Sequence, residues 1–179
     1  MKRIKFLIII LSCFSVNICF GEDQNIMPAT ETHRDWGVFI PLGKKQCFVA
    51  SQAIKMEAFR GGEKLSSVNR ARGRLFIWKS ETNIGKYEGV YFAGFPLQVG
   101  SKPILKVDGK KRIAFVASPK PTTEEEKNYA WNQVFDDEVL IETLKKGNKA
   151  VMEAISHRNT KIRDTFVLTG FTTSLKRMK

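Results

Sequence analysis

The chain has 179 residues and a formal net charge of +12, with 30 lysines and arginines against 18 aspartates and glutamates. This length suits one domain with its own core, and the absence of a linker-like segment argues against two domains. Such a basic surface attracts anionic partners, although it can equally serve only to keep the protein soluble.

The first 21 residues have the three-part layout of a bacterial signal peptide. Lys2, Arg3 and Lys5 precede the apolar run of residues 6–20, and Gly21 provides a small residue before Glu22. Loss of residues 1–21 would lower the formal charge from +12 to +9, because three cations leave. An uncleaved N-terminal anchor and lipidation at Cys13 are the alternatives.

Export would change both the partners that the protein meets and the number of cysteines that it retains. Outside the cytoplasm, a basic protein meets lipopolysaccharide, phospholipid head groups and acidic glycans, so we expect an anionic envelope or host-surface component, or a protein partner, and no nucleic acid. No transmembrane segment is expected after signal cleavage. Cys47 is then the only cysteine, and it lies in an apolar run that favours a buried, structural thiol.

Residues 22–34 are polar, contain Pro28 and are expected to form a flexible leader. Short strands are expected after it. The run Trp36–Ile40 is followed by a turn at Gly43–Lys45 and a second strand over Gln46–Ile54. Further strands are expected at Arg74–Lys79 and at Gly89–Ala93, which is rich in residues that suit a half-buried sheet.

The strongest hairpin signal is Asp108-Gly109, between Ile104–Val107 and a strand that starts at Lys110. One short α-helix is expected near Asp136–Lys146, where Asp136 can cap the first turn and Gly147 can end the last. A closing strand pair is expected after this helix, over 150–156 and 165–169. Many short strands with one helix predict a mainly β, antiparallel sandwich over residues 35–179.

No catalytic, cofactor-binding or metal-binding constellation is recognisable. The two histidines, His33 and His157, have no partner at a ligand-like spacing, and Arg60-Gly61-Gly62 lacks the pattern of a phosphate-binding loop. We therefore expect a protein that is not an enzyme. A hydrolase whose site is assembled from distant residues is an alternative.

Basic clusters are the remaining candidates for a site. Lys110, Lys111 and Arg112 follow the hairpin turn and form a candidate patch for an anionic surface. Arg70, Arg72 and Arg74 alternate and would share one face of an extended segment. Both clusters can also be solvated edges that discourage aggregation between sheets.

Several segments in order resemble the invasion-associated locus B family. They are 35–39 (DWGVF), 45–52 (KQCFVASQ), 95–100 (FPLQVG), 105–110 (LKVDGK), the helix 137–146 with Gly147, and 164–175 (DTFVLTGFTTSL). The resemblance covers residues 35–175, nearly the whole exported chain. Where a cysteine is common in the family shortly after the tryptophan, this chain has Ile40, and the usual later cysteine pair between Phe115 and Trp131 is absent.

The resemblance implies an exported, immunoglobulin-like β-sandwich from a Gram-negative bacterium, located in the periplasm or associated with the outer envelope, or secreted. It also implies that Trp36, Gly170 and Phe171 are core and turn residues with structural roles. The expected function is a virulence-associated envelope protein that binds a protein partner or an anionic surface without catalysis. A secreted factor that promotes host-cell interaction is the main alternative.

Processing of the signal peptide is directly testable. In a periplasmic extract, intact-mass measurement should find a chain that begins near Glu22, because Gly21 is the small residue that a peptidase would recognise. A full-length species confined to the cytosol would contradict export, and a lipid-modified mass would instead support processing at Cys13.

Overall fold

The structure, a computed structural model, describes residues 27–40, 47–79, 87–133 and 137–178. Its strands are β1 (Glu31–His33), β2 (Trp36–Phe39), β3 (Phe48–Gln52), β4 (Lys55–Arg60), β5 (Glu63–Lys64), β6 (Arg74–Lys79), β7 (Tyr87–Phe92), β8 (Ile104–Val107), β9 (Lys111–Ala117), β10 (Tyr129–Asn132), β11 (Lys149–Ile155) and β12 (Lys161–Val167). The helices are α1 (Asp137–Lys146), α2 (Phe171–Arg177) and the 3-10 helix η1 (Glu126–Asn128). The expected mainly β fold is confirmed.

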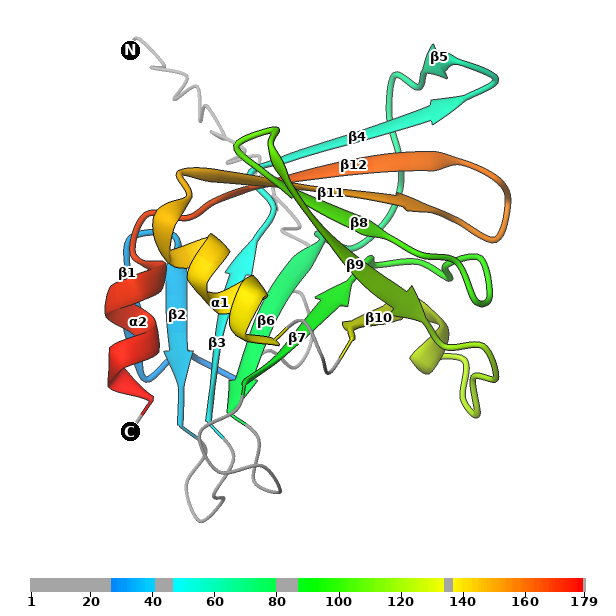
Figure 1. Ribbon diagram of the computed structural model, residues 1–179. Coiled ribbons are helices and arrows are strands. Elements are labelled where there is room, and N and C mark those ends of the chain that lie inside the picture. The colour runs from blue at the N-terminus through cyan, green and yellow to red at the C-terminus, as the bar shows by residue number, and fades with distance from the viewer. Residues whose placement is uncertain (1–26, 41–46, 80–86, 134–136, 179) are drawn as a thin grey trace, which may run out of the picture.

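All the strands described belong to one antiparallel sheet that folds back on itself (Figure 1). Their order is β1-β2-β3-β6-β7-β10-β9-β8-β11-β12-β4-β5. Strand β9 belongs to both halves, because its first residues pair with β8 and its last pair with β10. The two halves face each other across the core, an arrangement consistent with the expected sandwich.

A second corner lies between β3 and β4. The backbone N–H of Ala53 donates to the carbonyl oxygen of Gly73 at 2.8 Å, and that of Ile54 donates to Thr165 at 2.8 Å. Adjacent residues thus bond to opposite halves of the sheet. Bends of this kind make the corners of packed sheets whose strands run in different directions.

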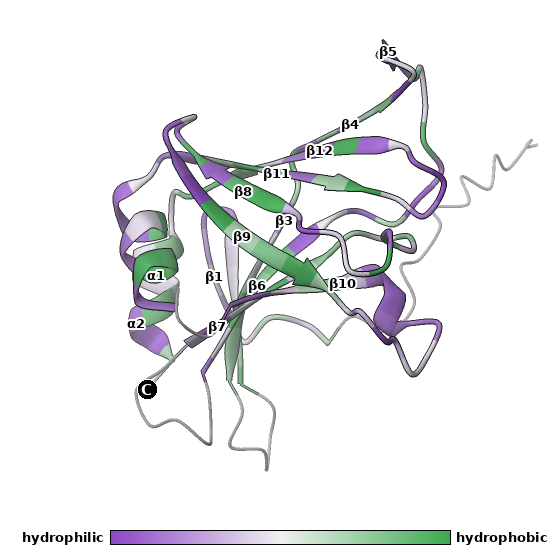
Figure 2. Ribbon diagram, turned by 45° about the vertical axis from the view of Figure 1, so that its right-hand side comes forward, coloured by the Kyte–Doolittle hydropathy of each residue, from purple (hydrophilic) through white to green (hydrophobic). Residues whose placement is uncertain are grey.

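The core fills the space between the halves and extends under the helices. Its largest fully buried side chains are Trp36, Tyr91, Phe115, Phe166, Phe171, Leu75, Ile77, Leu97, Leu105, Leu140, Leu144 and Met152. Figure 2 shows hydrophobic residues along these strands and along α1, with hydrophilic residues at tips such as the β8–β9 turn. In the described ranges no helix has the length and apolar character to cross a membrane.

The elements with strong local signals form as expected. The backbone φ angles of Asp108 and Gly109 are 48° and 71°, the positive values that a tight two-residue hairpin turn requires. Helix α1 begins at Asp137 and buries Leu140, Ile141 and Leu144. The proposed cap Asp136 and the turn at residues 43–45 lie outside the described residues.

Two elements near the chain ends differ from expectation. Residues 31–33, assigned to the leader, form β1, which pairs with β2. Residues after Gly170 form α2, a second helix where only the one near Asp136–Lys146 was expected. An ion pair joins α2 to β1, because the Arg177 guanidinium donates to both carboxylate oxygens of Glu31, at 2.8 and 2.9 Å.

The structure brings together three of the residues expected to be structural. The Trp36 and Phe171 ring centroids are 4.8 Å apart, and Trp36 Nε1 donates to the carbonyl oxygen of Val167 at 3.0 Å. Gly170 has a φ of 97°, and a Cβ there would collide with the carbonyl oxygen of His33. Cys47 lies elsewhere in the core as a buried, free cysteine.

A buried ion pair joins the two halves. Arg70 Nη1 donates to Asp164 Oδ2 at 3.0 Å and to the carbonyl oxygen of Ala93 at 2.8 Å, while Nη2 donates to Asp164 Oδ1. The Arg70 side chain is 1 % exposed and that of Asp164 is 0 % exposed. Interpreting Arg70 as part of a solvated edge was therefore wrong, because its partner lies on β12.

Tyr91 completes this buried network. Its hydroxyl donates to Asp164 Oδ2 at 2.7 Å, from β7 across the core to β12. Burial and the adjacent Asp164 carboxylate raise the pKa of Tyr91 well above its usual value, which keeps the hydroxyl protonated as a donor. Gly73 makes room for the carboxylate, since a Cβ at this position would collide with Asp164 Oδ2.

Substitutions in this network should lower the free energy of unfolding most where they leave a buried charge without its partner. Tyr91→Phe should lower the free energy of unfolding by about 1–2 kcal/mol through one lost hydrogen bond. Asp164→Ala should lower it by about 3–5 kcal/mol, because a buried guanidinium loses its counter-charge. Urea unfolding measures both. The double variant Arg70→Met, Asp164→Leu should recover most of the loss, and a double variant as unstable as Asp164→Ala would contradict an ion-pair role.

Candidate functional site

The outward surface of β4, β5, β8, β9, β11 and β12 concentrates positive charge. Alternation along these strands sends most of the large apolar residues inward and most of the charged residues outward. In the described part of the chain this surface, the cationic face, carries seven cations against Glu57 and Glu153. The cations are Lys55, Lys64, Lys106, Arg112, Lys149, Lys161 and Arg163.

The strand register places several of these cations side by side. Arg112 pairs with Lys106 across β8 and β9, although like charges directly opposite each other destabilise a sheet. Arg163 on β12 pairs with Glu57 on β4, and Glu153 on β11 pairs with Arg163. The charges therefore form one continuous surface.

Each carboxylate on the cationic face is shared by two cations. Glu57 Oε1 lies 2.7 Å from Lys64 Nζ and 3.0 Å from Lys55 Nζ. Glu153 lies 2.7 Å from Lys106 Nζ and 3.5 Å from Arg163 Nη2. Hydrogen bonds from Lys64 and Lys55 lower the pKa of Glu57 to about 2, and a hydrogen bond from Lys106 lowers that of Glu153. Sharing leaves the face with an excess of positive charge.

A trough of about 620 Å³ opens on the cationic face. Phe59, Ile104 and Ile155 give it apolar walls. Its charged lining consists of Lys102, Lys106, Lys161 and Arg163 against the single carboxylate of Glu153. The Arg163 guanidinium also lies 5.2 Å from the centroid of the Phe59 ring, which helps to fix its position. Apolar walls with a cationic lining suit a ligand that has both an anionic and an apolar part.

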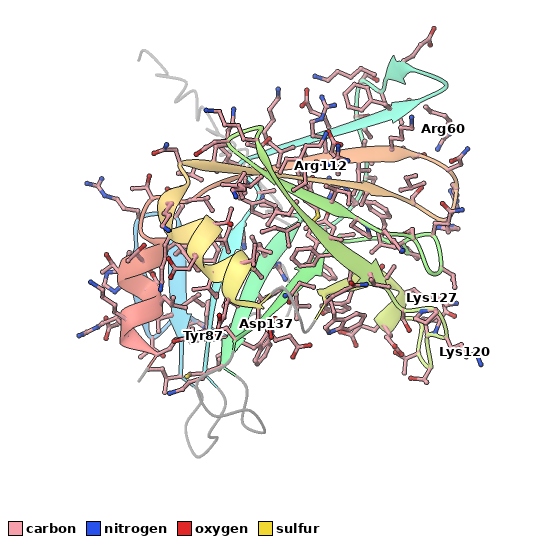
Figure 3. All side chains as sticks on the ribbon, in the orientation of Figure 1. Arg60, Tyr87, Arg112, Lys120, Lys127 and Asp137 are labelled. Carbon is pink, nitrogen blue, oxygen red and sulfur yellow. The ribbon has the colours of Figure 1, made fainter. Side chains whose placement is uncertain are left out.

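The expected patch Lys110, Lys111 and Arg112 lies at one end of this surface. All three residues are exposed, and only Arg112 has the outward register of the cationic face. Arg60 and Arg112 both lie in the half of the molecule built from β4, β12, β11 and β8 (Figure 3). Asp108, beside the patch, accepts hydrogen bonds from the backbone N–H groups of Asn148 and Lys149, which lower its pKa and tie the turn to β11.

Sequence reasoning missed most of the cationic face. Lys55, Lys106, Lys161 and Arg163 do not form a cluster in the chain, and only the pairing of distant strands brings them together. The usable signal was alternation, as in Lys161-Ile162-Arg163, where a buried residue separates two exposed cations. Such a pattern identifies an outward surface, but not which strands share it.

The remaining candidates stay apart. Arg72 donates to the carbonyl oxygen of Ala53 at 3.1 Å, and the Arg74 guanidinium lies 5.5 Å from the Phe92 ring centroid, so the alternating arginines do not form one patch with Arg70. His157 is exposed near the carbonyl oxygen of Pro96. Within the described ranges, no group of three or more histidine, cysteine or acidic side chains is placed to hold a metal ion.

Comparison with known proteins identifies the family to which the chain belongs. Searches of curated proteins and of solved structures found no match. The family model described as "Invasion associated locus B (IalB) protein" matches residues 44–179, about three quarters of the chain, from just before β3 to the last residue. The matched region includes every strand of the cationic face. The chain belongs to the invasion-associated locus B family.

Proposed function

We propose that this protein is a non-enzymatic component of the bacterial envelope that binds an anionic amphiphile through the cationic face. The observation that carries the proposal is the trough, where four cations and one carboxylate surround apolar walls. Family membership and the expected signal peptide support a location in the envelope. Anionic lipids and lipopolysaccharide are the abundant envelope molecules with this combination of charge and apolar surface.

The fold supports binding rather than a purely solubilising charge. Charges that only keep a protein soluble need no particular arrangement, and opposite signs are then best interspersed. Here Arg112 faces Lys106 directly, and Lys102 and Lys161 line the trough without an ion pair among the described residues. Uncompensated cations beside apolar walls favour an anionic ligand, because they gain a counter-charge when it binds.

Three variants of equal charge change can locate the binding surface. Lys102→Gln with Lys161→Gln alters the trough, Lys110→Gln with Lys111→Gln alters the hairpin tip, and Lys120→Gln with Lys176→Gln is the matched control. Each cation near an anionic surface contributes about 1 kcal/mol, so the trough variant should bind phosphatidylglycerol vesicles about thirtyfold more weakly. Vesicle co-sedimentation at two salt concentrations measures this, since salt screens charges beyond about 8 Å.

The variants separate the possible outcomes. Weaker binding by the tip variant alone would move the site to Lys110 and Lys111. Equal weakening by all three would leave only the overall charge as an explanation. In the opposite direction, Glu153→Gln should strengthen binding, because it frees Lys106 and Arg163 from their shared carboxylate. A Glu153→Gln variant that binds no better would argue against the trough. Release of product from bound lipid would support a hydrolase instead.

The electrostatics of the cationic face can also be measured without a ligand. The Glu57 carboxyl should titrate near pH 2 in the folded protein, against about 4.5 in the unfolded chain. Because the folded-state pKa is the lower one, the stability that Glu57 contributes is present at neutral pH and is lost as the pH falls through this window. NMR titration of the carboxyl carbon tests this. A midpoint near 4.5 would mean that Lys55 and Lys64 do not bind this carboxylate.

A further inference from the structure

The other half of the sheet has an outward surface of a different kind. Seven aromatic side chains, the aromatic face, project from β2, β3, β6, β7 and β10. They are Phe39, Phe48, Phe76, Trp78, Phe92, Tyr129 and Trp131. All seven are partly exposed. The residues between them in these strands, such as Val49, Ile77 and Tyr91, point into the core. The outward side of this half is therefore largely aromatic, and the strand register adds Gln52, Arg74 and Glu88 to it as polar residues.

The aromatic rings form two groups on this surface. Phe48 contacts Phe39 and Trp78, with ring centroids 4.6 and 4.2 Å apart, and Phe92 contacts Tyr129 at 5.1 Å. Both helices pack on the opposite side of these strands. There, Phe171 contacts Trp36, and a Cβ at Gly89 would collide with Leu140. Neither helix therefore covers the aromatic face, as Figure 1 also shows.

An antiparallel sheet normally exposes a polar surface on the side away from its core. Large apolar patches on a soluble domain mark contacts with proteins or membranes. The aromatic face is therefore expected to contact a protein or a membrane.

The path of the chain points to a lipid surface. A hollow of about 280 Å³ lies among Phe39, Phe48 and Phe76 on the aromatic face, and Met27, the first residue described, lines it. The apolar run of residues 6–20 precedes Met27 by only seven residues in the sequence. A fully extended chain of this length spans about 25 Å at most. During export, before cleavage near Glu22, the run therefore brings the aromatic face to within this distance of the membrane.

The chemistry of the aromatic face matches the same location. Tryptophan and tyrosine concentrate at membrane–water interfaces, where an apolar ring and one polar atom are both accommodated. The Arg74 guanidinium lies beside one of these rings, 5.5 Å from the Phe92 centroid, as its cation–π partner. We propose that the aromatic face rests on the phospholipid surface of the membrane across which the chain is exported, and that it stays there after the N-terminal apolar run has been cleaved.

The positions of the three tryptophans allow a direct test. Trp78 and Trp131 lie on the aromatic face, whereas Trp36 is fully buried in the core. The exported chain that begins at Glu22 is mixed with vesicles of phosphatidylcholine whose acyl chains carry bromine, which quenches tryptophan at short range. Because phosphatidylcholine is zwitterionic and carries no net charge, it should not bind through the cationic face. Trp78 and Trp131 should lose fluorescence in these vesicles, compared with vesicles of unbrominated lipid.

A variant with Trp78→Phe and Trp131→Phe retains only Trp36 and should show no such loss. Because this chain lacks the apolar run of residues 6–20, quenching reports contact of the aromatic face and not insertion of the run. A chain that co-sediments with the vesicles but shows no quenching beyond that of the Trp36-only variant would overturn the proposal. Urea unfolding of the variant confirms that it folds.

A second experiment distinguishes lipid from protein as the occupant. A photo-crosslinking amino acid replaces Phe48 in the full chain in intact cells, and replaces Val99, an exposed apolar residue outside the aromatic face, in the control. Lipid adducts at position 48 and not at 99 are the expected result. Crosslinks at position 48 to a second copy or to another protein, without lipid adducts, would overturn the membrane assignment.

Lipid affinity provides an independent measure. Phe48→Ser with Trp78→Ser should weaken vesicle binding by about tenfold or more in total, because each ring is already partly buried and gains only part of the about 1.5–3 kcal/mol that full burial contributes. The control Val99→Ser with Val139→Ser changes two exposed apolar residues elsewhere. Equal effects of the two pairs would argue against a specific aromatic contact. The trough variants should leave binding to this zwitterionic lipid unchanged, so failure of either proposal is recognised separately.

Discussion

The buried ion pair between Arg70 and Asp164 fixes the relation between the two halves of this protein. Asp164 lies on β12, and Arg70 reaches it from the segment before β6, while Tyr91 donates to the same carboxylate from β7. A charge pair with such low exposure is weak evidence for net stability, because desolvation offsets the Coulomb attraction. Its effect is to select one arrangement of the two halves. Any shift of β12 relative to β6 and β7 would leave a charged side chain in the core without its partner.

This arrangement sets two different surfaces back to back. The cationic face is the outward side of one half, and the aromatic face is the outward side of the other. Because one set of buried residues lies between them, neither surface can move far without disturbing the Arg70–Asp164 pair. A rigid body of this kind could hold an anionic ligand on one side while its other side rests on a membrane. Charge and aromatic area are separated in this fold, so each can be changed without the other.

The parts of the fold that were predictable from sequence depend on neighbours in the chain. Asp108-Gly109 specifies its turn through positive φ angles, and α1 has acidic residues in its first turn and lysines in its last. Helix α2 was not predicted because Phe171, Thr172 and Thr173 are poor helix formers. Packing of Phe171 on Trp36 outweighs this low helix propensity. The role of Arg70 depends on a residue 94 positions away, which no local pattern reveals.

The same reasoning explains why the hairpin patch was only a partial guide to the site. Lys110, Lys111 and Arg112 are adjacent in sequence, yet adjacent residues of a strand point to opposite sides of the sheet. Only Arg112 therefore joins Lys106 and the other cations, whose common surface depends on the pairing of β8, β11, β12 and β4. In a β protein of this family, a functional surface should be sought in every second residue of paired strands. A run of like charges at a turn marks, at best, one edge of it.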